Sequence, residues 1–292
     1  MNLVEYMDKQ SNYTLYTPNE IFEELKNSGI KPLHLPFTYS YYFLVSYLYK
    51  QCAYHYITPN NNDIKMYLGL CDKYRYVDYI IKKGGELDQL LFTQTIINYP
   101  VGFEYDEEGY IDFDLLQDEE SYIKEMYMKR HSNNYTIKYP VKCFSRYPVD
   151  DLEVLDGTYY QMLDTHRTEL STFKFMLSNS ELGANGFYLY QFLLYKCDKF
   201  EKYTGTIKMI QDELPFTERY LYKYLKLLKD YGCIQIESTQ TYNSKCKLVK
   251  RNEYTIKHHS QFKLSEDRQL NYSTWYKIDS VYNIYSKYSN YN

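Results

Sequence analysis

The feature that most constrains the fold of this 292-residue chain is a change of hydrophobic period at Gly232. Before this glycine, leucine and tyrosine recur at helical spacing from Thr217 to Tyr231, and after it apolar and polar residues alternate as in a strand. Threonine is suited to capping the start of a helix, and glycine commonly follows the end of one. We therefore predict a helix over 217–231 that leads directly into β structure.

The residues around this helix predict a longer series of elements, each separated from the next by a cap, a break or a turn. The series consists of a helix at 184–200, a break at 203–205, a helix at 207–214 capped by Thr206, the helix at 217–231, and strands at 233–239 and 246–257 joined by a polar turn at 241–245. The two strands are expected to form a hairpin.

Over residues 187–256 this order resembles the winged helix-turn-helix domains of bacterial, phage and plasmid DNA-binding proteins. The positions that carry the resemblance are Thr206, Ile207, Ile210 and Leu214, then Thr217, Arg219 and Leu221, then Tyr224, Leu225, Lys226, Leu228, Gly232 and Ile234. The resemblance implies that the helix at 217–231 enters the DNA major groove and that the hairpin, or wing, contacts the flanking backbone.

Residues 41–114 repeat the same order more faintly. The predicted elements are a helix at 41–54, a helix at 64–70 capped by Asp63, a helix at 73–83 ended by Gly84, and strands over 87–99 and 101–114 with a turn at 106–109. Two such domains in one chain resemble the layout of plasmid replication initiators.

We therefore predict an α+β, mostly helical fold with two winged helix-turn-helix domains in tandem. The predicted divisions are an N-terminal winged-helix-like domain at 1–117, a helical and extended connector at 118–183, a DNA-binding domain at 184–260 and a helical tail at 261–292. Within the connector and tail we expect helices at 118–131, 158–182 and 274–287 and an extended segment at 135–144.

Charge is distributed unevenly along the chain. The net charge is −4 overall, but residues 1–150 carry 15 Lys and Arg against 21 Asp and Glu, a net −6. Residues 184–260 carry 13 Lys and Arg against 8 Asp and Glu, a net +5. The positive field therefore belongs to the segment that resembles a DNA-binding domain.

The candidate DNA contacts lie on the polar side of the 217–231 helix and on the wing. Arg219 is suited to a bidentate contact with guanine, Lys223 and Lys226 to phosphates, and Thr217 and Tyr222 to phosphate or thymine methyl groups. The wing adds Lys245, Lys247, Lys250 and Arg251. The alternative interpretation of this polar side is a solvated helix surface.

In the N-terminal copy the expected wing is acidic, because it contains Glu104, Asp106, Glu107, Glu108, Asp112 and Asp114. Such a hairpin repels phosphate, so a DNA contact from this half would use Arg75, Tyr79 and Lys82. Binding of a protein partner or of a second copy of the chain is an equally favoured role for residues 1–117.

The amino-acid composition indicates the source of the chain, its cellular location and its relation to membranes. The chain has 40 tyrosines but alanine only at Ala53 and Ala184, which is typical of AT-rich coding DNA such as that of low-GC bacteria, plasmids and phages. Six scattered cysteines indicate reduced thiols and a cytoplasmic protein. The longest apolar stretch, residues 39–49, is too short to span a bilayer, so no membrane association is expected.

No enzyme motif was found. The chain lacks a P-loop, G-x-G-x-x-G, H-E-x-x-H and the His-x-His pair of nicking enzymes, and His166-Arg167 is interpreted as ordinary helix surface. Cys233 and Cys246 with His258 and His259 have irregular spacing for zinc. We expect no catalytic activity, no metal and no cofactor.

The sequence thus predicts a protein that binds double-stranded DNA in a sequence-specific way, with a transcriptional regulator of a phage, plasmid or low-GC bacterium as the first hypothesis. A replication initiator that binds origin repeats is the alternative. A second alternative is a phage-encoded inhibitor module that binds a protein through its acidic N-terminal half.

Overall fold

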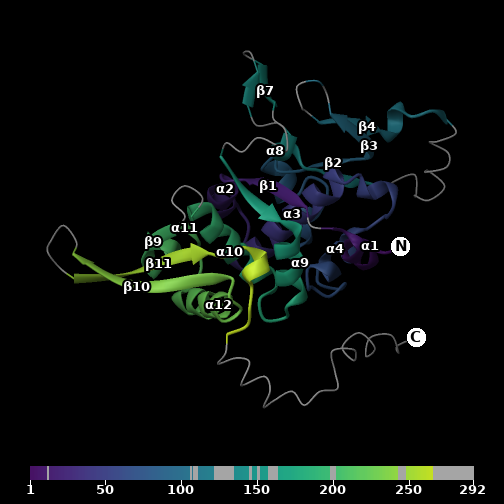
Figure 1. Ribbon diagram of the computed structural model, residues 1–292. Helices are drawn as coiled ribbons and strands as arrows, with labels where there is room; N and C mark the ends of the chain where they lie inside the picture. The colour runs from purple at the N-terminus through teal and green to yellow at the C-terminus, as the bar shows by residue number, and fades with distance from the viewer. Residues whose placement is uncertain are drawn as a thin grey trace, which may run out of the picture.

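Two helices at the centre of the protein, α3 (Leu35–Lys50) and α10 (Gly183–Cys197), pack against each other (Figure 1). Their contact is aromatic, with ring centroids 5.3 Å apart for Phe43 and Phe187 and 5.5 Å apart for Tyr39 and Tyr188. Every residue of α3 is buried, so the rest of the protein surrounds this helix on all sides. The computed structural model describes residues 1–11, 13–105, 107, 111–121, 135–144, 147–149, 152–156, 164–197, 202–242 and 248–265.

The N-terminal segment wraps around α3 and joins a strand from the middle of the chain. Its elements are α1 (Leu3–Lys9), β1 (Thr14–Pro18), α2 (Ile21–Asn27) and the 3-10 turn η1 (Pro32–His34). Strand β1 pairs antiparallel with β8 (Thr165–Glu169), and Leu15 lies opposite Thr168. This two-stranded ribbon therefore connects segments that are about 150 residues apart in sequence.

Residues 53–118 contain short elements that only partly match the predicted N-terminal copy. They are η2 (Ala53–His55), α4 (Asn61–Tyr67), α5 (Asp78–Ile81), α6 (Glu86–Gln89), β2 (Gln94–Ile96), β3 (Pro100–Tyr105), β4 (Ile111–Leu115) and η3 (Leu116–Asp118). The hairpin of β3 and β4 is confirmed. It forms a sheet of its own, while β2 pairs with β5 (Ile137–Tyr139).

Three details of the predicted N-terminal copy are wrong. The cap of α4 is Asn60, and Asp63 is the third residue of the helix, where it completes a capping box. The predicted helix at 73–83 is reduced to the four residues of α5, because buried Lys65 binds the Tyr74 carbonyl at 3.2 Å and the Asp78 carboxylate at 3.0 Å. These bonds hold the preceding residues in turns. The predicted strand at 87–99 begins as α6.

The connector is also more mixed than expected. Its described elements are β5, α8 (Val141–Phe144), β6 (Tyr147–Val149), β7 (Leu152–Asp156), β8 and α9 (Leu170–Ser178). Of the predicted helix at 158–182, residues 158–163 lie outside the described residues, β8 replaces its next part, and α9 confirms the part that follows. The predicted extended segment at 135–144 ends as α8. His166 is not on a helix surface: it is fully buried on β8, where Tyr39 and Asn19 bond its two ring nitrogens. Residues 122–134 and the tail helix predicted at 274–287 lie outside the described residues.

The C-terminal part agrees best with the predicted series. After α10 come β9 (Lys202–Gly205), α11 (Ile207–Glu213), α12 (Glu218–Asp230), β10 (Ile234–Tyr242), β11 (Leu248–Ile256) and η4 (His259–Gln261). The strands form an antiparallel sheet in the order β9–β11–β10. The predicted break at 203–205 is a strand, because β11 offers it hydrogen-bond partners that its own sequence does not reveal.

Buried side chains from Leu3 to Tyr254 belong to one hydrophobic cluster. Helix α10 contributes to it from its position between α3, α9, α12 and β11. The combination of helices with several small sheets confirms the α+β class. The predicted divisions at residues 117, 183 and 260 remain predictions. Within the described part of the chain, every helix is too short or too polar to cross a lipid bilayer.

Candidate nucleic-acid interface

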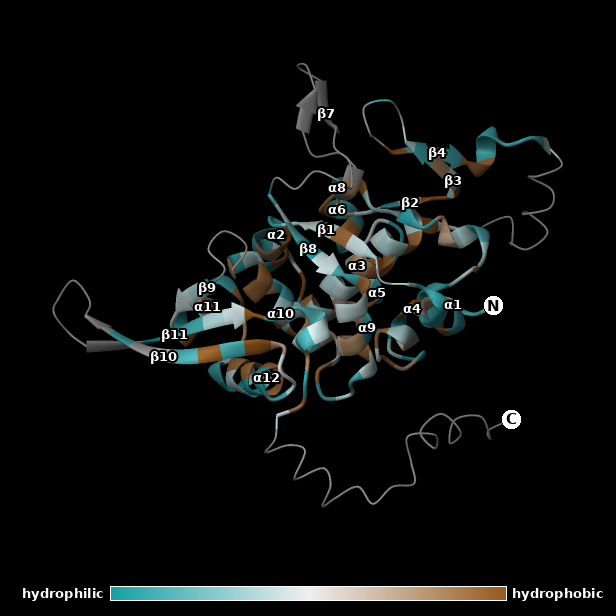
Figure 2. Ribbon diagram, in the orientation of Figure 1, coloured by the Kyte–Doolittle hydropathy of each residue, from teal (hydrophilic) through white to brown (hydrophobic). Residues whose placement is uncertain are grey.

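Helix α12 packs on the core with one side and leaves the other in solvent. Leu221 and Leu228 are fully buried, and Leu225 is 3 % exposed. In Figure 2 the helix carries both hydrophobic and hydrophilic colour along its length. The leucines at helical spacing therefore form the buried side, as the sequence pattern predicts.

Both ends of α12 are fixed by local hydrogen bonds. At the start, the hydroxyl oxygen of Thr217 accepts a hydrogen bond of 3.3 Å from the backbone N–H of Tyr220. At the end, Gly232 has a φ of +66° and its N–H donates to the Lys229 carbonyl at 2.9 Å. The N–H of Cys233 donates to Leu228 at 2.8 Å, which completes a Schellman motif. The predicted caps Thr217 and Gly232 are confirmed.

A side chain on α10 fixes the rotation of α12 about its axis. The Oδ1 of Asn185 accepts a hydrogen bond from the Tyr220 hydroxyl at 2.9 Å, and its Nδ2 donates to the Tyr224 hydroxyl at 3.0 Å. The two tyrosine rings lie 4.6 Å apart, and Tyr220 also stacks on Phe216 at 4.2 Å. This contact determines which residues of α12 face outward.

The outward face of α12 is cationic. Arg219, Tyr222, Lys223 and Lys226 are all exposed, and Lys229 extends the same face toward the end of the helix. No described carboxylate lies within ion-pair distance of these cations, although Lys223 lies 5.0 Å from the ring centre of Tyr224. The charges are therefore available to an anionic partner.

The predicted wing contacts are only partly described. Lys245 and Lys247 lie outside the described residues. Lys250 belongs to β11 and pairs with Gln240 in the backbone register, while its side chain is outside the description. Arg251 is half-buried on the same strand, next along the ladder. The structure thus provides the hairpin, and the contacts of its lysines remain predictions.

The three predicted N-terminal contacts do not share one helix. Arg75 is exposed in the turn before α5, and Lys82 is exposed just after it. Between them, the Tyr79 hydroxyl accepts a hydrogen bond from the Lys31 N–H at 3.0 Å and lies 3.2 Å from His34 Nδ1. Tyr79 therefore already holds the loop before α3, and a DNA contact from these residues remains an untested prediction.

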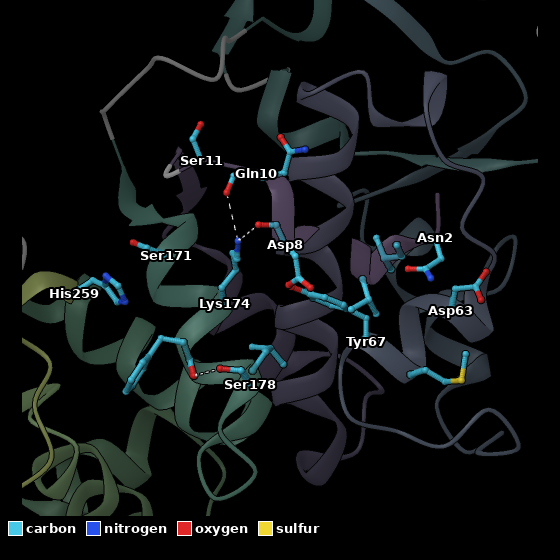
Figure 3. Close-up of a pocket in the computed structure, with 15 residues that line it drawn as sticks. Asn2, Asp8, Gln10, Ser11, Asp63, Tyr67, Ser171, Lys174, Ser178 and His259 are labelled. Carbon is cyan, nitrogen blue, oxygen red and sulfur yellow. Dashed lines mark hydrogen bonds between the residues drawn. The ribbon is translucent and has the colours of Figure 1, made fainter. Parts of the chain in front are cut away.

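Sequence reasoning missed a cleft of about 790 Å³ between α1, α4 and α9 (Figure 3). Lys174 extends from α9 across it and donates to the carbonyl oxygens of Met7 at 2.8 Å and of Asp8 and Gln10 at 3.4 Å. This ammonium therefore caps the C-terminal end of α1. Its partners are backbone atoms from a distant segment, which no sequence motif marks.

Four of the five described cysteines are buried, and Cys71 is exposed. The described cysteines form no disulfide, and burial raises the pKa of Cys197 to about 11 and that of Cys233 to about 12. Thiols with such pKa values are poor nucleophiles at neutral pH. In the same part of the chain, no group of three or more His, Cys, Asp or Glu side chains is arranged to hold a metal ion.

Comparison with known proteins adds no relative. No protein-family model matches the chain, and no curated protein or solved structure matches it significantly.

Proposed function

We propose that this protein binds double-stranded DNA through the outward face of α12. The observation that carries the proposal is the set of exposed cations on this helix with no carboxylate partner in the described part of the chain. The order α10–β9–α11–α12–β10–β11 and the strand order β9–β11–β10 support a winged helix-turn-helix assignment for this part. In that fold the helix at the position of α12 reads the major groove.

The residues of α12 have distinct proposed roles. Arg219 lies one residue into the helix, where a guanidinium makes a bidentate contact with the O6 and N7 atoms of guanine. Lys223 and Lys226 follow at spacings of four and three residues, so they lie on the same face and neutralise phosphates. The exposed ring of Tyr222 contacts the backbone or a thymine methyl group.

Transcriptional regulation is the role we favour. An initiator that grips successive major grooves needs two reading helices, whereas the N-terminal segment has the four-residue α5 in place of the expected 73–83 helix. Its hairpin of β3 and β4 also carries exposed acids, including Glu104 and Asp112. One cationic reading helix combined with an acidic segment supports a single-site regulator over an initiator.

The test is fluorescence anisotropy with DNA fragments that flank the gene, measured at several salt concentrations. We expect specific complexes whose log affinity falls linearly with log salt concentration. Changing Arg219, Lys223 and Lys226 together to Gln should make that slope less steep by about 1.8, since Lys223 and Lys226 are the phosphate contacts among them and each contributes about 0.9. The matched control changes the exposed Lys9, Lys31 and Lys73 to Gln, which removes the same charge elsewhere.

Two results would overturn the proposal. One is the absence of any complex at low salt, which would leave a protein-binding module as the better hypothesis. The other is an equal loss of affinity in the control, which would assign the binding to net charge and not to α12. Between regulator and initiator, an inverted repeat over a promoter supports the first and direct repeats at an origin support the second.

A further inference from the structure

A second hollow, the β8–β11 groove, is lined by residues 167–169 of β8, by residues 255–257 at the end of β11, and by α10, which contributes Leu194 and Cys197. Its volume is about 640 Å³, within the usual range for small-molecule sites. The groove lies where the N-terminal ribbon of β1 and β8 meets the C-terminal sheet. It is separate from the outward face of α12.

The groove presents positive charge. Arg167 is exposed on β8 and Lys257 is half-buried just after β11, and neither makes an ion pair with a described carboxylate. Glu169 is the one acid among the described lining residues, and its Oε1 lies 2.6 Å from His258 Nε2. Burial lowers the pKa of His259, so that ring is uncharged near pH 7. The described lining therefore has two cations, Arg167 and Lys257, and its one carboxylate, that of Glu169, is already paired with His258.

The lining also contains apolar surface. Leu194 and Ile256 are half-buried, so their carbon atoms remain in contact with solvent. An apolar group placed against them removes this surface from water. The combination of an apolar lining with cations that have no described carboxylate partner is suited to a ligand that has an anionic end and an apolar body.

We propose that the β8–β11 groove binds a small organic carboxylate. Its carboxylate pairs with Arg167 and Lys257, and its apolar body covers Leu194 and Ile256. A guanidinium matches the two oxygens of a carboxylate in a bidentate contact, and the ammonium adds a second charge-assisted hydrogen bond. A neutral amide of the same shape has one acceptor oxygen and no charge, so it pairs more weakly with the two cations.

The groove is connected to the end of α12 through one backbone hydrogen bond. The N–H of Lys257 donates to the Cys233 carbonyl at 3.0 Å, and Cys233 closes the Schellman motif after α12. A ligand held by Lys257 therefore touches the strand end that is tied to the DNA-facing helix. An effect of the ligand on DNA affinity rests on the proposed function, whereas ligand binding does not.

Isothermal titration calorimetry of the full chain tests the site with 2-naphthoate and its neutral isostere 2-naphthamide. We expect saturable binding of 2-naphthoate at least tenfold tighter than that of the amide. Arg167→Gln and Lys257→Gln should each lower the affinity for 2-naphthoate at least fivefold. Lys73→Gln, which removes an exposed cation outside the groove, should leave binding unchanged. Urea unfolding checks that all three variants fold as the wild type does.

The proposal is overturned if benzoate, 2-naphthoate and 4-methylpentanoate all fail to bind saturably. It is equally overturned if carboxylate and amide bind alike, or if Lys73→Gln weakens binding as much as Arg167→Gln. DNA anisotropy with saturating 2-naphthoate separates this site from the proposed function. Binding of 2-naphthoate that depends on Arg167, in a protein that forms no DNA complex, supports the ligand site and rejects the DNA proposal.

Discussion

The Asn185 side chain on α10 accepts a hydrogen bond of 2.9 Å from the Tyr220 hydroxyl on α12. Asn185 also donates to Tyr224, one turn further along, so one amide holds two successive turns of α12. Leucines along α12 bury one side of the helix, and the two hydrogen bonds of Asn185 add a polar contact that holds the same orientation. The orientation that leaves Arg219 in solvent is therefore supported by a residue that lies outside α12.

Asn185→Ala is expected to lower the free energy of unfolding by about 1–3 kcal/mol, because it removes two hydrogen bonds between neutral groups. Urea denaturation measures the loss. As a control, Tyr220→Phe should cost about 1 kcal/mol in the wild type and almost nothing in the Asn185→Ala background. Additive losses from the two changes would contradict the coupling of these residues.

Gly232→Ala is expected to destabilise the protein by about 2–5 kcal/mol. An added Cβ would lie 2.5 Å from the Lys263 carbonyl oxygen, and the residue has a φ of +66°. The matched control is Gly84→Ala, since Gly84 has the same φ with nothing within 4 Å of the added atom. Its cost should be about 1–2 kcal/mol, from the left-handed backbone alone. Equal thermal shifts for the two variants would disprove the close approach of Lys263.

Asp88 should contribute to stability at neutral pH and lose this contribution in acid. Burial alone would raise the pKa of Asp88, but hydrogen bonds from Lys138, Thr93, Thr95 and Gly84 outweigh it and lower the pKa below its usual value. Burial lowers the pKa of Lys138 in spite of this pairing, since Lys138 is the more deeply buried partner. Because the carboxylate is favoured in the folded state, its contribution is present above pH 4 and declines as pH falls further.

The change Asp88→Asn tests this contribution. We expect a loss of about 2–4 kcal/mol at pH 7, because the ammonium of Lys138 is left buried without its anion. The loss in unfolding free energy should become smaller when urea unfolding is measured at successively lower pH, down to pH 3. Asp112→Asn, at an exposed position of β4, should change stability by less than about 0.5 kcal/mol at every pH. A pH-independent loss in Asp88→Asn would contradict the assignment.

Lys50→Met is expected to raise the free energy of unfolding by about 1–3 kcal/mol at pH 7. Burial lowers the pKa of Lys50 to about 8, so the side chain is still charged at neutral pH. The residue is only 2 % exposed, so this charge is buried. Between pH 8 and 10.5 the unfolded wild type binds one more proton than the folded state, so wild-type stability gains with pH. The advantage of the variant should therefore narrow above pH 8. If the difference in unfolding free energy between variant and wild type stayed constant from pH 7 to 10, packing and not charge would be its cause.

Arg219 and Lys226 should differ in how their loss affects sequence choice. Arg219→Gln is expected to cost about 1–3 kcal/mol at one base pair of the target and to relax the preference there. Lys226→Gln should weaken all targets alike and reduce the salt slope by about 0.9. Anisotropy with a set of single-base-pair variants of the target measures both. Uniform losses for both changes would reject the base contact of Arg219.

The sequence by itself determined the elements whose signals are local. Thr206 and Thr217 cap α11 and α12, Gly232 ends α12, and the alternating residues beyond it form the hairpin of β10 and β11. These features depend on the backbone preferences and side-chain hydrogen bonds of residues within a few positions of one another. A single chain segment carries that information.

The tertiary structure decided the rest. Residues 203–205 became a strand because β11 lies beside them, and residues 73–77 stayed in turns because Lys65 holds Tyr74 and Asp78. The β8–β11 groove joins residues that are 90 positions apart. Each of these outcomes rests on a partner that is distant in the chain. The free energy of such a contact depends on how the core brings the two segments together, which neither segment encodes alone.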